Sequence, residues 1–291
     1  MSKEITMADR SVVISGLPAS GKTTYLAALW HLVTAREAKA LRFESLRHGD
    51  ATHLNAIAAR WRSARVQDRT PVGSDRLVSM NLVDETGRSV RVTFPDVSGE
   101  AFRRMWEDRE CEPAIADIIR SGNVLLFVHA DTIQAPQWVA DVAALSRQLG
   151  LPLPEGGEVP WNPRLAPTQV QLVGLLQLLC SPPLDIGPRK LGVVLSAWDK
   201  AEGEQLTPED FIEAKLPLLH QYLRWSGARW LWRAYGVSAQ GGDYDSADEK
   251  AASLPQANAL RALDRPAMRI KLISEGRESN DLTEPLAWLV E

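Results

Sequence analysis

The stretch Gly16-Leu17-Pro18-Ala19-Ser20-Gly21-Lys22-Thr23 matches the pattern G-x-x-x-x-G-K-[ST]. A short apolar run, 12–15, precedes it, and an apolar segment with helical spacing, 25–33, follows it. A strand, this loop and a helix in succession are the context in which the pattern binds phosphate. The sequence therefore predicts a nucleotide site at the start of an α/β fold.

The chemistry of this loop assigns a role to most of its residues. Its glycines let the backbone wrap a phosphate, and the start of the next helix presents unpaired N–H groups and a positive dipole end. Lys22 can reach the β- and γ-phosphates, where it also serves catalysis, and the Thr23 hydroxyl can ligate Mg²⁺. The residues expected to hold the phosphates are Gly16, Ser20, Gly21, Lys22, Thr23 and Thr24.

Composition narrows the class of protein. The chain has 291 residues, of which 45% are hydrophobic and 24% charged, as is typical of a globular protein with a full core. A net charge of -4 does not favour nucleic acid or an anionic membrane as a partner. Two widely separated cysteines form neither a disulfide framework nor a metal site. With no secretory signal or membrane-spanning run, we expect a cytoplasmic protein.

The remaining pattern predicts a single domain, 1–291, with the α/β fold of a P-loop NTPase: a mostly parallel sheet with one antiparallel hairpin strand and helices on both faces. An insertion at about 130–190 and a C-terminal extension at about 253–291 are expected to decorate it. The expected strands are 12–15, 77–83, 90–94, 124–128, 191–195, 230–237 and an edge strand at 268–273. The expected helices are 25–35, 50–66, 101–120, 138–149, 168–180, 208–225 and 281–290.

A basic stretch, 36–69, separates the first helix from the hairpin. Its middle has helical spacing, with Leu54, Ile57 and Trp61 near one face. This spacing predicts a surface helix with a solvated arginine face. A face that binds phosphate, a protein partner or nucleic acid is the alternative interpretation.

A second motif, Asp96-x-x-Gly99, directly follows the second strand of the hairpin. In a nucleotide site, an acidic residue at a strand end holds Mg²⁺ through water, opposite the phosphate loop. A glycine after it leaves its N–H free for the γ-phosphate, so that the segment senses hydrolysis. We therefore expect Asp96 at the metal and Gly99 at the nucleotide.

This order of motifs resembles the Ras-like or TRAFAC class of P-loop GTPases. In that class an [NT]-K-x-D element selects guanine, and in Ser196-Ala197-Trp198-Asp199 only the aspartate, Asp199, matches it. The lysine that covers the base is missing, so Trp198 or Lys200 is the candidate to replace it. Ser238 and Ala239 match the S-A-K element of the class, whose alanine N–H contacts the guanine oxygen.

A narrower resemblance rests on two further stretches. The run 21–30 and the ending 281–288 are similar to the bacterial double-GTPase group of this class. Proteins of that group are associated with multi-gene conflict and anti-phage systems. The resemblance implies signalling to protein effectors or co-encoded components of such a system.

The class also implies switch residues around the γ-phosphate. Thr70, before the hairpin, is the best-placed candidate for the threonine that senses Mg²⁺; a turn residue before proline is the equal alternative. Glu100 stands where a water-orienting glutamine is common, and its charge predicts slow hydrolysis. Arg69 or Arg65 is a candidate for an arginine that stabilises the transition state in cis. His129 ends a strand at the ligand-binding edge of the sheet and is expected near the site.

The sequence thus predicts a switch that binds GTP or GDP with Mg²⁺, hydrolyses GTP slowly or when a partner stimulates it, and signals to proteins. Three other functions stay open, and a nucleic-acid-binding module that uses the basic stretch 36–69 is one of them. An ATP-binding ATPase or kinase would explain the altered base-selecting element. A non-hydrolysing nucleotide-binding scaffold would explain Glu100.

Overall fold

The computed structural model describes residues 10–67, 77–95, 98–136, 147–150, 160–246 and 252–291. Its centre is a nine-stranded sheet with the strand order β2-β3-β4-β1-β5-β6-β7-β8-β9. The parallel strands are β4 (Ser89–Phe94), β1 (Ser11–Gly16), β5 (Asn123–His129), β6 (Arg189–Ser196) and β7 (Trp230–Ser238). Antiparallel strands flank them: β3 (Val78–Val83) and β2 (Arg42–His48) at one edge, and β8 (Lys271–Ser274) and β9 (Arg277–Ser279) at the other. The predicted mostly parallel sheet with its hairpin is confirmed.

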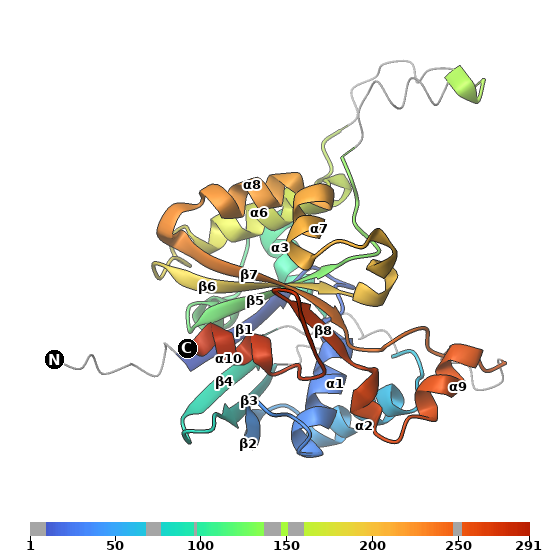
Figure 1. Ribbon diagram of the computed structural model, residues 1–291. Coiled ribbons are helices and arrows are strands. Elements are labelled where there is room, and N and C mark those ends of the chain that lie inside the picture. Colours follow the sequence, from blue (N-terminus) through green and yellow to red (C-terminus); the bar gives the residue numbers. More distant parts are fainter. Residues whose placement is uncertain (1–9, 68–76, 96–97, 137–146, 151–159, 247–251) are drawn as a thin grey trace.

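Helices cover both faces of the sheet (Figure 1). One layer contains α1 (Lys22–Thr34), α2 (Ala51–Arg62), α9 (Pro255–Arg261) and α10 (Glu284–Val290). The other contains α3 (Glu100–Glu107), α4 (Pro113–Ile119), α6 (Thr168–Leu179), α7 (Pro208–Lys215) and α8 (Pro217–Trp225). Val12 and Ile14 of β1 belong to the first core and Val13 to the second, because successive side chains of a strand point to opposite faces.

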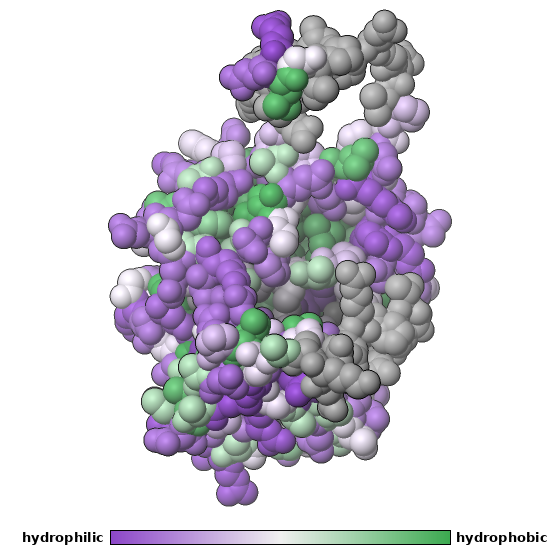
Figure 2. Space-filling model, turned by 90° about the vertical axis from the view of Figure 1, so that its right-hand side faces the viewer, coloured by the Kyte–Doolittle hydropathy of each residue, from purple (hydrophilic) through white to green (hydrophobic). Residues whose placement is uncertain are grey.

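The surface is mainly polar on the side that Figure 2 shows. Hydrophilic residues dominate its coloured part, and hydrophobic residues lie there in small separate areas. This distribution is ordinary for a folded protein, whose surface keeps scattered apolar side chains.

Among the described residues the predicted helices are confirmed, but two of them are each divided into two shorter helices. The segment 101–120 forms two helices, because 108–112 separates α3 from α4 and Pro113 begins α4. The segment 208–225 likewise breaks at Leu216, and Pro217 begins α8. Proline suits the first turn of a helix and interrupts its interior, so both breaks follow from the sequence. The predicted helix 138–149 lies almost entirely outside the described residues.

Strands β2 and β9 and helix α9 were not predicted, and β9 rather than β8 forms its edge of the sheet. β2 lies inside the basic stretch, at the edge of the sheet, and each of its residues is half-buried or exposed. An edge strand of this kind carries no apolar run, and its register against β3 shifts twice. Within the same stretch the helix prediction is confirmed, because α2 buries Leu54, Ile57 and Trp61.

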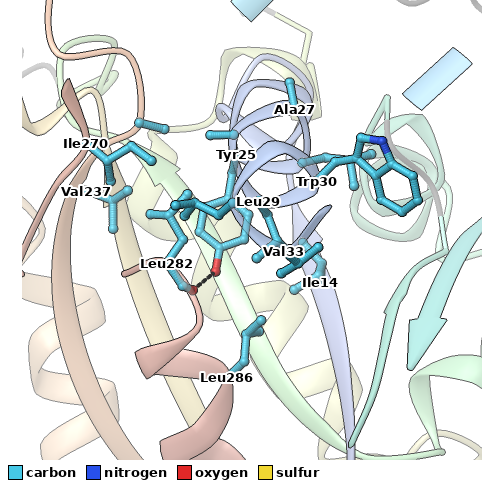
Figure 3. Close-up of a cluster of buried hydrophobic side chains, with 14 of the residues drawn as sticks. Ile14, Tyr25, Ala27, Leu29, Trp30, Val33, Val237, Ile270, Leu282 and Leu286 are labelled. Atoms are coloured by element: carbon cyan, nitrogen blue, oxygen red, sulfur yellow. Dashed lines mark hydrogen bonds between the residues drawn. The ribbon is translucent and has the colours of Figure 1, made fainter. Parts of the chain in front are cut away.

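The first helix, α1, lies at the centre of the first core (Figure 3). Its Tyr25 packs edge-on against Phe127 of β5, with ring centroids 4.9 Å apart. The Tyr25 hydroxyl donates a hydrogen bond of 2.6 Å to the carbonyl oxygen of Leu282, and Figure 3 shows this contact between α1 and the segment before α10. Burial raises the pKa of Tyr25 well above its ordinary value, so the phenol remains a donor.

The ending 281–288 has a structural role in this arrangement. The buried Asp281 carboxylate accepts hydrogen bonds from the backbone N–H groups of Lys39 (2.7 Å) and Ala40 (2.8 Å). The Thr283 hydroxyl accepts one from the N–H of Leu41 at 3.1 Å. These contacts fasten the start of α10 to the connection between α1 and β2.

His31 of α1 makes the stability of the fold sensitive to acid. Burial, with Arg62 and Arg269 nearby, lowers the pKa of His31 to about 4, and Glu37 is the acidic group that faces it, at 3.9 Å. At a pH between the pKa of His31 in the unfolded chain and its lower pKa in the folded chain, the unfolded chain binds a proton that the folded chain does not. The free energy of unfolding therefore falls as the pH falls from about 6.5 towards 4, by about 2 kcal/mol at pH 5.

Urea unfolding at pH 7 and pH 5 measures this loss. His31→Gln should remove about that much of the difference between the two pH values, whereas the matched change His48→Gln, at an exposed site, should leave it in place. An unchanged pH difference in His31→Gln would assign the acid sensitivity to other groups.

Candidate functional site

The phosphate loop connects β1 to α1 with backbone angles that favour glycine. Gly16 has φ +148° and Gly21 has φ +91°. A Cβ atom on Gly16 would lie 2.8 Å from the Phe127 carbonyl oxygen, and one on Gly21 would lie 2.7 Å from the Ser196 hydroxyl. Both glycines are therefore required by conformation and by close packing.

Lys22 begins α1 and is only 2% exposed. Its ammonium group lies 2.8 Å from the carbonyl oxygens of Gly16 and Leu17 and 3.2 Å from the Ser20 hydroxyl. The loop thus folds around a positive charge at a helix N-terminus, which is an arrangement suited to an anion. Gly21 caps the helix without a side chain, and Thr23 and Thr24 follow in its first turn.

Gly99 lies directly against the phosphate loop. It has φ +87°, and a Cβ atom there would lie 2.6 Å from the Lys22 nitrogen and 2.8 Å from the Gly16 carbonyl oxygen. Gly99 also precedes α3, whose first residue, Glu100, pairs with Arg103. The predicted meeting of the two motifs is therefore seen at Gly99, whereas Asp96, Thr70 and Arg69 lie outside the described residues.

Strand β6 ends beside the same loop. The Ser196 hydroxyl donates a hydrogen bond of 2.8 Å to the Ser20 carbonyl oxygen, over 176 residues of sequence. Ser196 stands where the GTPase pattern has asparagine, and no role was predicted for it. Its polar side chain at the end of a buried strand was the available signal.

The carboxylate of Asp199, which follows β6, is held by Ser238 at the end of β7. The Ser238 hydroxyl donates to Asp199 Oδ1 at 2.6 Å and accepts from the N–H of Gly241 at 3.0 Å. A small cavity of about 50 Å³ adjoins these groups; its lining includes Gly21, Thr24, His129, Ala197, Asp199 and Ala239. The structure therefore brings the phosphate loop and the expected base-reading residues to one place.

The expectation for Trp198 is wrong. Its side chain is 2% exposed and packs against Phe211 of α7, with ring centroids 5.4 Å apart, and against Gly236 of β7. The short 3₁₀ turn Trp198–Lys200 directs the indole into the second core, away from the cavity. The ammonium of Lys200 pairs with Asp243 at 2.6 Å, and neither residue lines the cavity.

His129 lines the cavity, as expected from its place at the end of β5. Its Nδ1 accepts a hydrogen bond from the N–H of Asp131 at 3.3 Å. Burial lowers the pKa of His129, an effect that Asp131 and Asp199 partly oppose. With Nδ1 as an acceptor, the neutral form of this imidazole carries its proton on Nε2.

A larger groove, of about 650 Å³, lies beside β7, α7 and α8. It contains none of the motif residues, so charge and hydrogen-bonding groups identify the site better than volume does. Among the described residues, no group of three or more His, Cys, Asp or Glu side chains is arranged to hold a metal ion. The helices that the structure describes are all too short or too polar to span a membrane.

Comparison with known proteins gives three results. A family model described as Double-GTPase 1 matches residues 13–289. Among solved structures, the chain is similar to "putative nucleolar GTP-binding protein 1" of Plasmodium falciparum, at 12% identity and a TM-score of 0.37, over 89% of this chain and 87% of that one. No curated protein matches it.

Two structures of the Ski7 GTPase-like domain of S. cerevisiae are also similar, each with a TM-score of 0.37. The form bound to GTP has 11% identity, over 90% of this chain and 51% of that one. The form bound to GDP and inorganic phosphate has 10% identity, over 91% and 58%.

Proposed function

The chain belongs to the Double-GTPase 1 family, and we propose that it is a GTP-binding switch that hydrolyses GTP slowly and signals to protein partners. One observation carries the proposal: Gly99, the Ser196 hydroxyl and the Asp199 carboxylate all converge on the loop that holds Lys22. These groups serve the γ-phosphate, the loop and the base respectively.

In this proposal the loop and the first turn of α1 bind the phosphates. Lys22 would exchange its carbonyl partners for the β- and γ-phosphates, helped by the backbone of Gly16, Ser20 and Gly21. Thr23 and Thr24 follow in the first turn, and the Thr23 hydroxyl would supply an oxygen ligand of the kind that Mg²⁺ prefers. Asp96 and Thr70 complete the proposed metal site. Bound Mg²⁺ would neutralise charge on the phosphates.

Base selection falls to Asp199, with Ser238 and Ala239. Ser238 fixes one carboxylate oxygen, and so orients the side chain to accept from N1–H and the amine of guanine. Adenine offers an acceptor at N1, which would leave the carboxylate opposite a lone pair. The N–H of Ala239 is the proposed donor to the guanine oxygen.

Slow hydrolysis is part of the proposal. Glu100 lies next to Gly99 but is paired with Arg103, so its carboxylate is held away from the role of a neutral water-orienting group. Arg69 remains the proposed source of positive charge in the transition state. Turnover would then depend on what partner proteins add to the site.

The route to partner proteins is proposed to run through α3. The indole N–H of Trp106 donates to the Pro163 carbonyl oxygen at 2.9 Å, and Arg164 pairs with Glu107 at 3.0 Å. A movement of Gly99 would therefore be passed to the segment that carries Trp161 (73% exposed) and Leu165 (62% exposed). Partners from a bacterial defence system are the class that this proposal includes.

An ATP-binding ATPase is the second candidate. The observation in its favour is that Ala197, rather than lysine, lines the cavity beside Asp199. Displacing a labelled nucleotide with GTP, GDP, ATP and ADP in the presence of Mg²⁺ decides between the two. A guanine preference of about tenfold or more supports the switch, and equal or stronger ATP binding overturns it.

Asp199→Asn sharpens this test. Because hydrogen bonds to a charged group contribute about 1.5–3 kcal/mol, GDP should bind about 10- to 100-fold more weakly to the variant. The new amide can donate to the carbonyl that xanthine carries in place of the guanine amine, so xanthosine diphosphate should bind better than to the wild type. Asp243→Asn, outside the cavity, is the control and should change neither affinity. Unchanged GDP affinity in Asp199→Asn would exclude Asp199 from the base site.

A further inference from the structure

Trp61 connects α2 to the base-reading loop. It lies in the last turn of α2, is fully buried, and donates a hydrogen bond of 2.7 Å from its indole N–H to the carbonyl oxygen of Ala239. The two residues are 178 positions apart. Ala239 is also the residue whose N–H is proposed to contact guanine.

Arg269 holds Trp61 in this position. Its guanidinium lies 4.8 Å from the centre of the Trp61 ring and donates to the carbonyl oxygens of Trp61 (2.7 Å) and Leu260 (2.9 Å). Its backbone packs against the same loop, because a Cβ atom on Gly241 would lie 2.4 Å from the Arg269 carbonyl oxygen. Residues 239–241 are therefore enclosed between the indole and the Arg269 backbone.

The loop has a second attachment to the end of α2. Residues Arg65 and Asp245 form a parallel bridge, in which the N–H of Val66 donates to the Asp245 carbonyl oxygen at 2.9 Å. Arg261 of α9 contacts both the Ser63 carbonyl oxygen and the Asp245 carboxylate at 2.8 Å. The end of α2 and the loop after β7 thus form one hydrogen-bonded unit.

We infer that Trp61 is a positioning residue for guanine recognition. Its indole N–H orients the Ala239 carbonyl, and with it the backbone that faces the base. Without this donor the buried carbonyl would lose its partner, and Ala239, whose N–H faces the base in the proposed site, would be free to shift relative to the cavity. The inference rests on the proposed guanine site, and it assigns to α2 a role in binding the base but none in binding phosphates.

The test compares Trp61→Phe with Trp30→Phe. Each variant loses one indole hydrogen bond, because the Trp30 N–H donates to Asn55 of α2 at 2.9 Å. Trp61→Phe should bind GDP about tenfold more weakly than the wild type and keep its affinity for inorganic tripolyphosphate, which has no base. Trp30→Phe should keep both affinities.

The outcomes separate this inference from the proposed function. A wild type without guanine preference overturns the function itself, before any variant is measured. A wild type with that preference, and a Trp61→Phe variant that loses nothing or loses GDP and tripolyphosphate affinity equally, overturns only the role of Trp61. Equal thermal melting points for the two variants would show that a difference in GDP binding is not a difference in folding.

A measurement on the wild type also tests the inference, and it is needed if Trp61→Phe does not fold. Binding couplings are reciprocal, so a base that depends on Trp61 must also stabilise its surroundings. GDP should slow amide hydrogen exchange in 57–66 severalfold more than tripolyphosphate does. Equal exchange with the two ligands would overturn the inference.

Discussion

Lys22→Ala is expected to weaken binding of Mg²⁺–GTP by at least about a hundredfold. The ammonium is nearly inaccessible to water and already sits among three oxygen atoms of the loop. A charge-assisted hydrogen bond contributes about 1.5–3 kcal/mol, and two such contacts to phosphate oxygens are enough for this loss. Titration of a fluorescent GTP analogue measures it.

Lys39→Ala is the matched control for this variant. Lys39 is an exposed lysine in the connection between α1 and β2, and the pocket that it lines contains no residue of the phosphate loop. The Lys39→Ala variant should bind GTP as the wild type does. If Lys22→Ala also kept its affinity, the nucleotide would have to bind elsewhere, and the proposed function would be lost with it.

The phosphate loop shows why part of this site could be predicted from the sequence. Its glycines, lysine and flanking apolar runs are contiguous, so local rules fix both the backbone and the charge. The place of Gly99 was predictable too, because its segment follows a parallel strand next to β1 and so starts at the carboxyl end of the sheet, where the loop lies. These expectations needed no knowledge of distant contacts.

Trp198 shows what local rules miss. Its position beside Asp199 suggested that it covers the base, yet the 3₁₀ turn after β6 directs it into the core. Trp61 shows the complementary failure, since its partner Ala239 lies 178 residues away and no spacing in α2 indicates it. The roles of Arg69, Thr70 and Asp96 stay predictions.

The contacts of α3 and α2 support two separate roles for these helices around the proposed nucleotide. α3 follows Gly99 and contacts the segment 163–164, so it is placed to report the γ-phosphate. α2 contacts the loop after β7, so it is placed to report the base. The two helices lie in opposite layers of the sheet, and each long-range contact therefore serves one end of the proposed nucleotide.

Gly99→Ala is expected to weaken GTP binding relative to GDP binding and to lower GTP turnover by at least about a hundredfold. The left-handed φ of +87° strains any side chain, and the added Cβ would lie 2.8 Å from the Gly16 carbonyl oxygen, a backbone atom that cannot move aside without the loop. The segment would be pushed away from the γ-phosphate, while GDP, which lacks that group, should bind within a fewfold of the wild type.

Gly87→Ala separates the two effects of this substitution. Gly87 has φ +80° in the turn between β3 and β4, but nothing lies within 4 Å of a Cβ atom there. Both variants should lose about 1–2 kcal/mol of stability from backbone strain, and only Gly99→Ala should bind GTP more weakly relative to GDP. Because the strain is common to the two, a difference in nucleotide binding can only come from the contact with the phosphate loop. Equal behaviour of the two variants would mean that Gly99 shapes the chain without sensing the nucleotide.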